Sequence, residues 1–316
     1  MAILLCRKGF KVTLWSVSEE YALYLDKKRI NKKFLPGVSI PRNIRITSNL
    51  REALDFKDII ILAVPSQYAR AVLRKIRKLN ILKTDTILVS ATKGIEVVTL
   101  KRMSQLAREE LGNIKFAVIS GPTIAHEVAR GIPTTAVIAS SDKGLRKNLQ
   151  SIFMNGQFRI YTNDDVIGVE LGGSLKNVIA IACGISDGLG FGTNTKAALL
   201  SRGMAEISRL GAAMGAKVST FSGISGLGDL VTTCISPYSR NRFVGEQIGK
   251  GKSLIEITTH MQMVAEGVLT TKSAYGLSLK YKVDMPITKE VYLVLYKNKS
   301  PLNAVKDLMA REKKEE

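Results

Sequence analysis

The chain has 316 residues and a mass of 34.5 kDa, which predicts two domains at roughly 100–200 residues per domain. Its hydrophobic fraction of 45% and charged fraction of 23% are ordinary for a globular protein and exclude a disordered chain. The formal net charge is +20. We expect no apolar run to approach the roughly 20 residues that span a bilayer. The apolar start, residues 1–5, is too short for a signal peptide.

The three cysteines, Cys6, Cys183 and Cys234, are scattered and form no CxxC pair. This pattern excludes a disulfide scaffold and a cysteine-rich zinc site, and it suits a reducing, cytoplasmic compartment. The two histidines, His126 and His260, lie far apart without carboxylates at ligand spacing. We therefore expect no metal site.

The positive charge can indicate nucleic acid, anionic lipid or anionic small substrates as partners. Its densest clusters are residues 27–29, 32–33 and 74–78. The last cluster lies on a predicted amphipathic helix, and we interpret it as a solvated helix face. The single Trp, the lack of aromatic side chains between the clusters and the absence of a zinc-finger, RRM or homeodomain pattern argue against nucleic-acid binding.

The first half of the chain alternates strand-like and helix-like segments. The predicted helices cover residues 66–79 and 99–111. The predicted strands cover residues 11–15, 43–47, 58–65, 86–91, 116–120 and 135–139. Such alternation predicts a doubly wound parallel sheet, which holds ligands at the carboxyl ends of its strands.

The second half lacks the alternation of β-branched residues that is typical of strands. Its pattern predicts an all-helical domain. Its predicted helices cover residues 166–185, 195–215, 253–259, 270–280, 288–297 and 302–312. We place the domains at residues 1–164 and 165–316, with Thr162 or Asn163 as the N-cap of the first long helix.

Polar residues that folding alone does not require follow two of the predicted strands. Residues 90–96 place Lys93 at the carboxyl end of a strand, where its ammonium can point into a ligand crevice; the alternative is a surface lysine in a turn. Residues 120–125 form a Gly-Pro turn that opens a helix. Its exposed N–H groups suit an anion, and the alternative is a plain turn.

Two further segments lie in the helical half. Gly172 and Gly173 stand inside a helix, at a cost of roughly 1 kcal/mol each relative to Ala, which predicts close approach of another group to the backbone. Lys176 follows one turn later, either as a snorkelling side chain or as a poised acid/base, and we favour the second. Residues 223–230 form a glycine-rich loop that presents Asp229, and residues 239–241 offer a phosphate-binding donor set.

The sequence does not support a dinucleotide fingerprint in its second half or a Ser-His-Asp catalytic triad. The glycines of residues 188–192 follow a helix rather than a strand, so they are not a dinucleotide fingerprint. No GxSxG motif supports a Ser-His-Asp triad, and His126 is expected near the surface at a helix start.

Together these segments resemble the bacterial NAD(P)-dependent glycerol-3-phosphate dehydrogenase family over essentially the whole chain. The motifs that carry the resemblance are NKKFLPG (31–37), AVPS (63–66), SATKGIE (90–96), SGPTIAHEV (120–128), ELGGSLKNVIAIACGISDGLGFGTNTKAAL (170–199), SGLGDLVTTC (225–234), SRNR (239–242) and VAEGV (264–268).

The resemblance implies reduction of dihydroxyacetone phosphate to sn-glycerol 3-phosphate for glycerophospholipid synthesis, with NAD or NADP as cofactor and no metal. It also implies a Rossmann-type domain followed by a helical substrate domain of the 6-phosphogluconate dehydrogenase C-terminal type. Carried over residue by residue, Lys176 is the catalytic acid/base. Its burial and the nearby Lys93 should lower its pKa. The implied substrate-binding residues are Lys93, Gly121, Thr123, Lys176, Asp229, Ser239, Arg240 and Asn241. The implied cofactor-binding residues are Phe34, Lys93, Ala125, Arg240, Val264 and Glu266.

The sequence departs from the family pattern at its start. That pattern begins with a strand and a G-x-G-x-x-G turn, whereas residues 1–9 resemble the remainder of the helix that follows the turn. We therefore expect the first strand, a central one in the order 3-2-1-4-5-6, to be missing, which leaves two unpaired strand edges. Where the family has a pair of basic residues after the second strand, this chain has Val17 and Ser18. The preference between NAD and NADP therefore stays open.

Three alternatives stay open. The chain can be a truncated, non-catalytic remnant, a related β-hydroxyacid dehydrogenase or a basic nucleic-acid-binding protein. Residues 239–241 suit a phosphate better than a carboxylate alone, which disfavours the second alternative. We expect a phosphorylated small-molecule substrate, no nucleic acid and no membrane insertion, with a homodimer as one option for the assembly.

Overall fold

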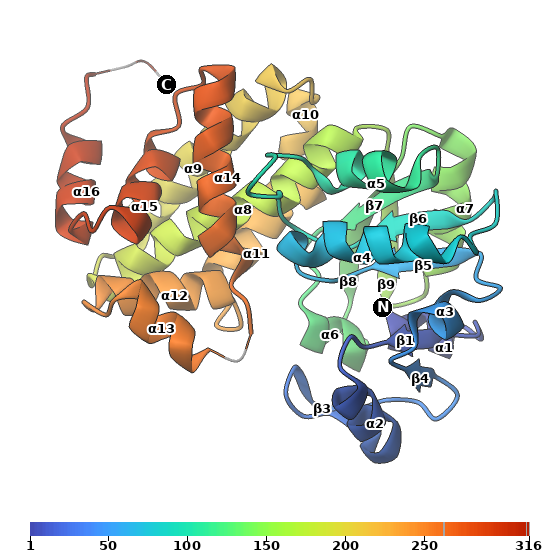
Figure 1. The fold of residues 1–316 in the computed structure, drawn as a ribbon. Coiled ribbons are helices and arrows are strands. Elements are labelled where there is room, and N and C mark those ends of the chain that lie inside the picture. The colour runs from blue at the N-terminus through green and yellow to red at the C-terminus, as the bar shows by residue number, and fades with distance from the viewer. Residues whose placement is uncertain (262, 314, 316) are drawn as a thin grey trace. The chain divides into compact units, whose positions relative to one another are not determined.

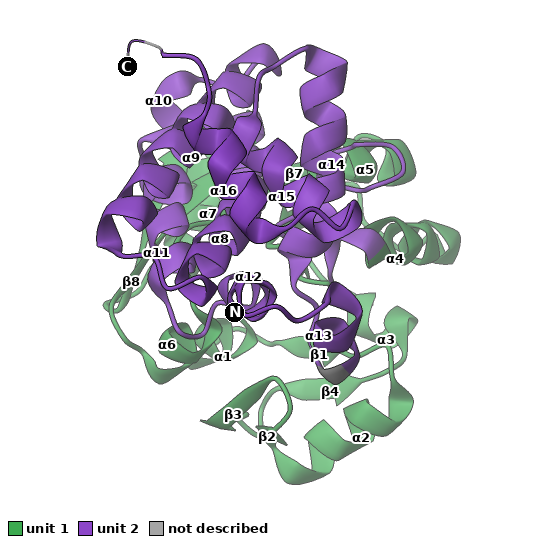
Figure 2. Cartoon of the chain, turned by 90° about the vertical axis from the view of Figure 1, so that its left-hand side faces the viewer, with its two compact units in different colours: residues 1–64, 68–92, 103–166 green, residues 65–67, 93–102, 167–316 purple. Residues whose placement is uncertain are grey.

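The computed structural model describes residues 1–261, 263–313 and 315. The chain divides into two compact units, which Figure 2 colours separately. Unit 1 comprises residues 1–64, 68–92 and 103–166, and unit 2 comprises residues 65–67, 93–102 and 167–316. Two short segments of the N-terminal half, residues 65–67 and 93–102, thus belong to the unit that holds the C-terminal helices.

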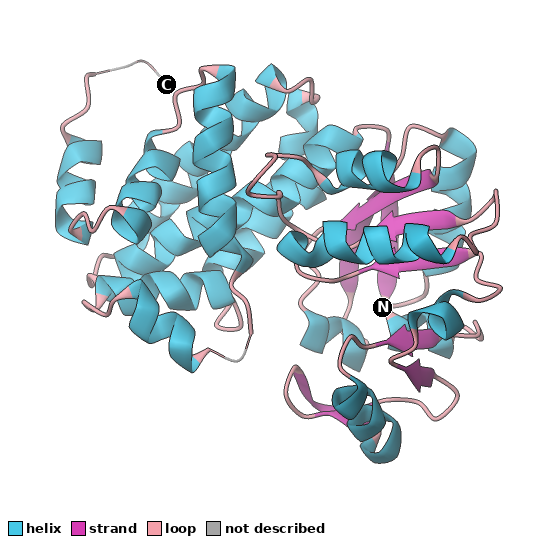
Figure 3. Ribbon diagram, in the orientation of Figure 1, coloured by secondary structure: helices cyan, strands magenta, loops and turns pink. Residues whose placement is uncertain are grey.

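The strands of unit 1 form three sheets (Figures 1 and 3). The largest sheet has the strand order β5-β6-β7-β8-β9. Its members are β5 (Ile59–Leu62), β6 (Ile87–Ser90), β7 (Lys115–Ser120), β8 (Thr134–Ala139) and β9 (Phe158–Asn163). The smaller sheets are the parallel pair β1 (Thr13–Trp15) and β4 (Arg45–Thr47), and the antiparallel pair β2 (Ile30–Asn31) and β3 (Leu35–Ser39).

Helices cover both faces of the five-stranded sheet. The helices of this half of the chain are α1 (Ala2–Arg7), α2 (Glu19–Lys28), α3 (Leu50–Leu54), α4 (Ser66–Leu79), α5 (Met103–Leu111), α6 (Ala125–Arg130) and α7 (Lys143–Phe153). Within β6, Leu88 packs with side chains of α4 and α5, while Val89 packs with α1 and α7. Because successive side chains of a strand point to opposite faces, double coverage explains the continuous apolar strands and confirms the doubly wound Rossmann-type domain.

The five-stranded sheet is not wholly parallel, and the predicted strand set lacks three members, β2, β3 and β9. β8 runs antiparallel to β7 and parallel to β9. Only the six-residue helix α6 lies between β7 and β8. At about 1.5 Å per residue this helix spans about 9 Å, shorter than the strands of about 20 Å, and an antiparallel neighbour needs no helix to carry the chain back along the strand. β9 was not predicted, because its charged and polar residues, among them Arg159 and Asn163, hide the apolar alternation of Phe158 and Ile160.

Several predicted helix ends are wrong, among them the start at residue 270, which the structure places at Glu266. The helix predicted from residue 99 begins at Met103, because Leu100 has a left-handed backbone with φ of 58° that ends helical geometry. Thr162 and Asn163 belong to β9 and do not cap the next helix. The Asn163 carboxamide oxygen instead accepts a hydrogen bond of 2.8 Å from the Asp165 N–H.

The predicted basic face of α4 is exposed, and it also binds a buried acid. Arg70, Arg74 and Arg77 contact the Glu110 carboxylate of α5 at 2.6, 3.1 and 3.4 Å. Glu110 is only 3% exposed. These arginines therefore fix α4 to α5, which accounts structurally for part of the densest basic cluster.

The start of the chain packs on this core. α1 places Leu4 and Leu5 against the five-stranded sheet, and Gly9, with φ of 88°, ends the helical turn. Within the described residues, β1 is hydrogen-bonded only to β4 and β5 only to β6, so each of these strands has one unpaired edge.

Unit 2 is helical. Its elements are α8 (Val166–Gly188), α9 (Thr193–Ala213), α10 (Val218–Phe221), the π-helix η1 (Ile224–Gly228), α11 (Asp229–Ile235), α12 (Arg240–Gly249), α13 (Leu254–His260), α14 (Glu266–Tyr281), α15 (Pro286–Tyr296) and α16 (Pro301–Met309). The predicted long helices are confirmed, whereas the elements between Val218 and Gly249 were not predicted as helices. These segments are too short and too rich in glycine to show the hydrophobic periodicity of about 3.6 residues that is typical of a helix.

α8 is the central helix of unit 2, and small residues let α12 lie directly against it. A Cβ on Gly184 would lie 2.0 Å from the Arg242 carbonyl oxygen, and a Cβ on Gly245 would lie 2.1 Å from the Ile181 carbonyl oxygen. Glycine is therefore required on both helices, and this contact fixes the position of the start of α12.

α8 is also long and apolar enough to cross a membrane by length and composition. The expectation that no stretch of this chain reaches that length is therefore wrong. However, 83% of its most apolar window is buried inside the protein, and a core helix of a globular protein has the same composition.

A buried acid joins α9 to α15. The Glu206 carboxylate accepts hydrogen bonds from the N–H groups of Ile287 and Thr288, at 2.6 and 3.1 Å. It thereby caps the start of α15, where Pro286 occupies the first helical position. Burial raises the pKa of Glu206 to about 7, and the hydrogen bonds to its charged form oppose that rise.

Candidate functional site

Lys176 is the buried polar centre of unit 2. It lies in the middle of α8 and is 5% exposed. Its Nζ donates to Asp229 Oδ1 and, at 2.6 Å, to Thr233 Oγ1, both on α11. The Thr233 hydroxyl in turn donates to the Asp229 carbonyl oxygen at 2.6 Å. The hydroxyl proton is thus directed away, and the lone pair faces the ammonium.

A second lysine binds the same carboxylate. Lys93 Nζ lies 2.8 Å from Asp229 Oδ2, and Lys93 comes from the segment 93–102 of unit 2. Asp229 is 1% exposed. One buried carboxylate therefore faces two ammonium groups, which leaves an excess positive charge at the site.

This arrangement lowers the pKa of Lys176 to about 8. The main cause is burial, which disfavours the charged ammonium, and the charge of Lys93 acts in the same direction. The Asp229 carboxylate opposes both. A lysine with a pKa near 8 exchanges its proton readily near neutral pH, as a general acid or base must. The side chain does not snorkel to solvent.

A glycine in α8 allows Asp229 to reach the lysine. A Cβ on Gly172 would lie 2.7 Å from the Ser225 carbonyl oxygen in η1. The predicted close approach is therefore present at Gly172, and the approaching group is the backbone of the π-helix. Because η1 continues directly into α11, this contact sets the position of Asp229. π-Helical turns occur frequently at functional sites.

The predicted phosphate-binding residues 239–241 begin α12. Ser239 is the N-cap, and its Oγ accepts from the Arg242 N–H at 3.2 Å. Arg240 Nη1 donates to the Val264 carbonyl oxygen at 2.8 Å, and burial lowers the pKa of its guanidinium. Asn241 Nδ2 donates to Asn177 Oδ1 at 2.8 Å, which links the start of α12 to the residue after Lys176.

Glu266 lies at the first turn of α14 and binds Ser66. Its carboxylate accepts from the Ser66 N–H at 2.9 Å and from the Ser66 hydroxyl at 2.5 Å. Gly267 N donates to Asn241 Oδ1 at 2.9 Å. Both Glu266 and the neighbouring Val264 are thus connected, through α14 and Arg240, to the start of α12.

The remaining predicted residues lie in unit 1. Gly121, with φ of 137°, follows β7, and Thr123 Oγ1 donates to its carbonyl oxygen at 3.2 Å. Ala125 is the first residue of α6. Phe34 is 39% exposed, and its ring meets the Tyr21 ring edge-on at a centroid distance of 5.6 Å.

Two residues of the site, Thr233 and Asn177, were not predicted from the sequence. Both have a positional signal. Thr233 stands four residues after Asp229, on the same helical face, and Asn177 follows Lys176 directly. Over the residues that the structure describes, no group of three or more His, Cys, Asp or Glu side chains is arranged to hold a metal ion.

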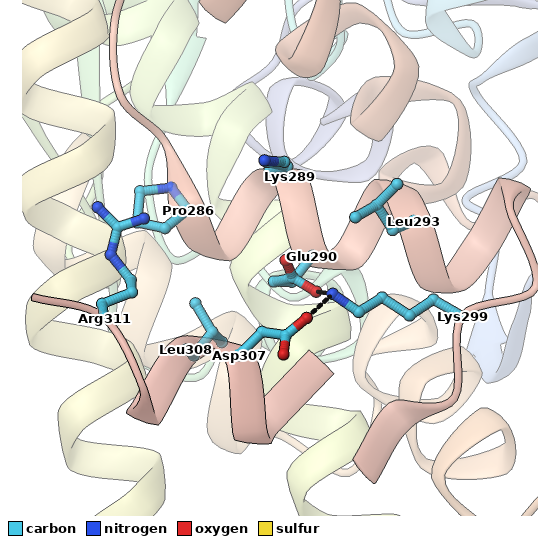
Figure 4. Close-up of a pocket in the computed structure, with 8 residues that line it drawn as sticks. All are labelled: Pro286, Lys289, Glu290, Leu293, Lys299, Asp307, Leu308 and Arg311. Atoms are coloured by element: carbon cyan, nitrogen blue, oxygen red, sulfur yellow. Dashed lines mark hydrogen bonds and ion pairs between the residues drawn. The ribbon is translucent and has the colours of Figure 1, made fainter. Parts of the chain in front are cut away.

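Unit 2 also contains a cavity of about 250 Å³ between α15 and α16, outside the lysine cluster. Figure 4 shows Lys299 of this cavity paired with both Glu290 and Asp307. Its residues are Pro286, Lys289, Glu290, Leu293, Lys299, Asp307, Leu308 and Arg311. The two ion pairs of Lys299 join α16 to α15. Because Lys299 already has two carboxylate partners, this cavity presents no acid/base chemistry of the kind found at Lys176.

Comparisons with known proteins agree with these features. The family model for the NAD-dependent glycerol-3-phosphate dehydrogenase N-terminus matches residues 1–146, and the model for its C-terminus matches residues 165–306. The glycerol-3-phosphate dehydrogenase [NAD(P)+] of Fusobacterium nucleatum is 49% identical over 99% of this chain and 94% of its own length. That of a Thermoanaerobacter species is 50% identical over 100% and 94%.

Solved structures give the same result. The structure of glycerol-3-phosphate dehydrogenase from Coxiella burnetii matches with a TM-score of 0.94 and 36% identity, over 98% of this chain and 94% of that one. A D-mandelate dehydrogenase, with a TM-score of 0.62 and 13% identity, shares the fold alone. The chain therefore belongs to the NAD-dependent glycerol-3-phosphate dehydrogenase family.

Proposed function

We propose that this protein is an oxidoreductase that interconverts dihydroxyacetone phosphate and sn-glycerol 3-phosphate with NAD or NADP. The observation that carries the proposal is the buried Lys176, held by Asp229 and Thr233 and with a pKa of about 8. Family membership gives the reaction class, and this lysine supplies the proton chemistry that the reaction needs.

Reduction of a ketone to a secondary alcohol requires a hydride at carbon and a proton at oxygen. The nicotinamide, when bound, supplies or accepts the hydride. The Lys176 ammonium donates its proton to the C2 carbonyl oxygen and becomes a neutral amine, which regains a proton from water. In the reverse direction the neutral amine takes the proton of the C2 hydroxyl. The hydroxyl of Thr233 and the carboxylate of Asp229 hold the nitrogen in place.

We assign the phosphate end of the substrate to the start of α12 and the reacting end to the lysine cluster. The proposed substrate-binding residues are Lys93, Gly121, Thr123, Lys176, Asp229, Ser239, Arg240 and Asn241. Arg240 offers the fork-shaped donor set that suits phosphate, and arginine side chains remain protonated in proteins.

The side chains of unit 1 have the chemistry to hold a dinucleotide. After β1, Val17 presents a largely exposed apolar surface (74%), and Ser18 and Glu19 offer a hydroxyl and a carboxylate suited to a ribose. Phe34 adds an exposed ring. The proposed cofactor-binding residues are Phe34, Lys93, Ala125, Arg240, Val264 and Glu266. We propose that residues 1–164 form the dinucleotide-binding domain and residues 165–316 the substrate and catalytic domain, with Lys93, Gly121 and Thr123 of the first also binding substrate and Arg240, Val264 and Glu266 of the second also binding the cofactor.

We further propose a cytoplasmic enzyme that needs no metal, no nucleic acid and no membrane insertion, and that can form a homodimer. The burial of α8 within unit 2 supports the absence of membrane insertion. Light scattering of the purified chain tests the dimer.

The test of the function is direct turnover. Purified protein mixed with dihydroxyacetone phosphate and a reduced nicotinamide cofactor should consume the cofactor, and Arg240→Ala should raise the KM for the phosphorylated substrate by about tenfold. The same assay with a β-hydroxyacid substrate should show no comparable rate. Absence of turnover with either nicotinamide cofactor would favour a non-catalytic protein.

A further inference from the structure

The segment that carries Lys93 has little regular structure of its own. Residues 93–102 belong to unit 2 and contain one isolated β-bridge, between Ile95 and Arg102, and no helix. Lys93 nevertheless reaches Asp229 at 2.8 Å. The segment has two backbone hydrogen bonds of its own, from Glu96 N to Lys101 O and from Leu100 N to Glu96 O. Nearer to Lys93, side chains from outside the segment bind its backbone.

Gln67 makes the most regular of these contacts. Its Nε2 donates to the Ile95 carbonyl oxygen at 2.9 Å, and its Oε1 accepts from the Val97 N–H at 3.0 Å. One carboxamide thus pairs with two backbone groups on one edge of the chain, as a neighbouring strand would. The same Nε2 lies 3.1 Å from Ser66 Oγ, which Glu266 holds.

The surroundings leave the segment little freedom on either side of this contact. A Cβ on Gly94 would lie 2.4 Å from Ser66 Oγ, so the backbone lies directly against Ser66. On the other side, Ser273 Oγ donates to the Ile95 carbonyl oxygen at 3.0 Å. Lys93 is only two residues from Ile95, so movement of this backbone moves the ammonium at Asp229.

We propose that Gln67 is a positioning residue for the reaction: its carboxamide clamps the backbone of Ile95 and Val97 and thereby holds Lys93 on Asp229, beside Lys176. This inference rests on the proposed function. Gln67 acts through Lys93, and its removal should affect the proton chemistry of Lys176 without loss of a group at the reacting centre.

The expected direction of that effect follows from the charges around Lys176. The ionisable groups that act there are Asp229 and Cys234 of α11 and Lys93 of the clamped segment. Lys93 lowers the pKa of Lys176, whereas Asp229 raises it. If the segment loosens and Lys93 leaves the carboxylate, the pKa of Lys176 rises.

The test compares Gln67→Leu with Gln150→Leu. Gln150 is a matched control, because its Nε2 also donates to a backbone carbonyl oxygen, that of Ile160 at 2.8 Å, but within unit 1 and outside the proposed site. Hydrogen exchange of the free protein, without substrate or cofactor, is the first measurement. Gln67→Leu should speed exchange at the Val97 amide by about tenfold, and Gln150→Leu should leave it unchanged.

Kinetics form the second measurement. Gln67→Leu should lower kcat for glycerol phosphate oxidation by about tenfold and move the rising limb of its pH profile to higher pH, whereas Gln150→Leu should change neither. In a Lys93→Ala background, Gln67→Leu should have little additional effect, because it acts through Lys93.

An unchanged Val97 exchange rate, an unmoved pH limb, or full additivity with Lys93→Ala would each overturn the inference. Failure of the proposed function would look different. In that case the wild-type protein would not turn over dihydroxyacetone phosphate, while the exchange comparison would still report whether Gln67 clamps the segment.

Discussion

Two buried carboxylates, Glu110 in unit 1 and Asp229 in unit 2, are each surrounded by basic side chains, but their partners differ. Glu110 binds three arginines of one helix, and Asp229 binds two lysines from separate segments. Arginine keeps its proton at all ordinary pH values, so the Glu110 cluster can only hold helices together. A buried lysine can release its proton, so the Asp229 cluster can take part in proton transfer.

The two clusters also differ in the burial of some of their cations, although Arg70, with 13% of its side chain exposed, lies between Lys176 and Lys93 in exposure. Arg74 and Arg77 keep more than half of their side-chain surface exposed, whereas the Lys176 side chain is 7% exposed. Solvent stabilises the charges of these two arginines. Burial of Lys176 destabilises its charged form and brings its pKa close to neutrality. A buried carboxylate among cations thus indicates function only when a partner can titrate.

The largest expected effect is loss of turnover on removal of the titrating group. Lys176→Ala should lower kcat by about 10²–10⁴-fold, the usual contribution of general acid–base catalysis, with a much smaller change in KM. Steady-state kinetics in both directions measure this effect. Arg70→Ala, at the other cluster, should leave kcat unchanged. Near-normal turnover of Lys176→Ala would remove the distinction between the two clusters.

The next largest effect concerns stability. Glu110→Gln should lower the free energy of unfolding by about 2 kcal/mol, because it removes the buried charge that Arg70, Arg74 and Arg77 share, while Arg70 keeps its contact with the more exposed Glu109. Urea denaturation measures it, with kcat of the folded variant as the control, which should match the wild type. The comparison would fail if Glu110→Gln altered kcat while leaving stability intact.

The smallest effect concerns the pH at which the oxidation rate reaches half its maximum. Glycerol phosphate oxidation needs the neutral amine of Lys176, so its rate should rise with pH and reach half its maximum near pH 8. Dihydroxyacetone phosphate reduction needs the ammonium and should fall over the same range. The Glu110→Gln variant should show the rising limb of this pH–rate profile at the same pH as the wild type. A limb near 10.5, the ordinary value for lysine, would show that burial does not act on Lys176 as described.

Much of the fold could be predicted from the sequence. The apolar runs around Ile59–Leu62 and Ile87–Ser90 predicted strands covered on both faces, and the long apolar stretch from Val166 predicted the central helix. These predictions succeeded because burial on all sides leaves a continuous local signal. The orientation of β8 and the existence of β9 depend on which neighbour each strand pairs with, and no local pattern carries that information.

The candidate site was partly predictable for the same reason. Lys176 and Gly172 violate the expected composition of a buried helix, so the sequence singled them out. Thr233 and Gln67 are ordinary residues in ordinary positions, and their roles arise only from the groups that they contact across 57 and 28 residues of chain. Such contacts leave no mark on local periodicity.

The sequence by itself determined the two-part organisation, the family resemblance and the lysine that does not suit its apolar helix. Only the tertiary structure decided that Asp229, Thr233 and Lys93 converge on this lysine, and that residues 65–67 and 93–102 join the helical unit. The physical reason is that burial and charge act through space. The pKa of Lys176 depends on groups that folding places around it, and not on its neighbours along the chain.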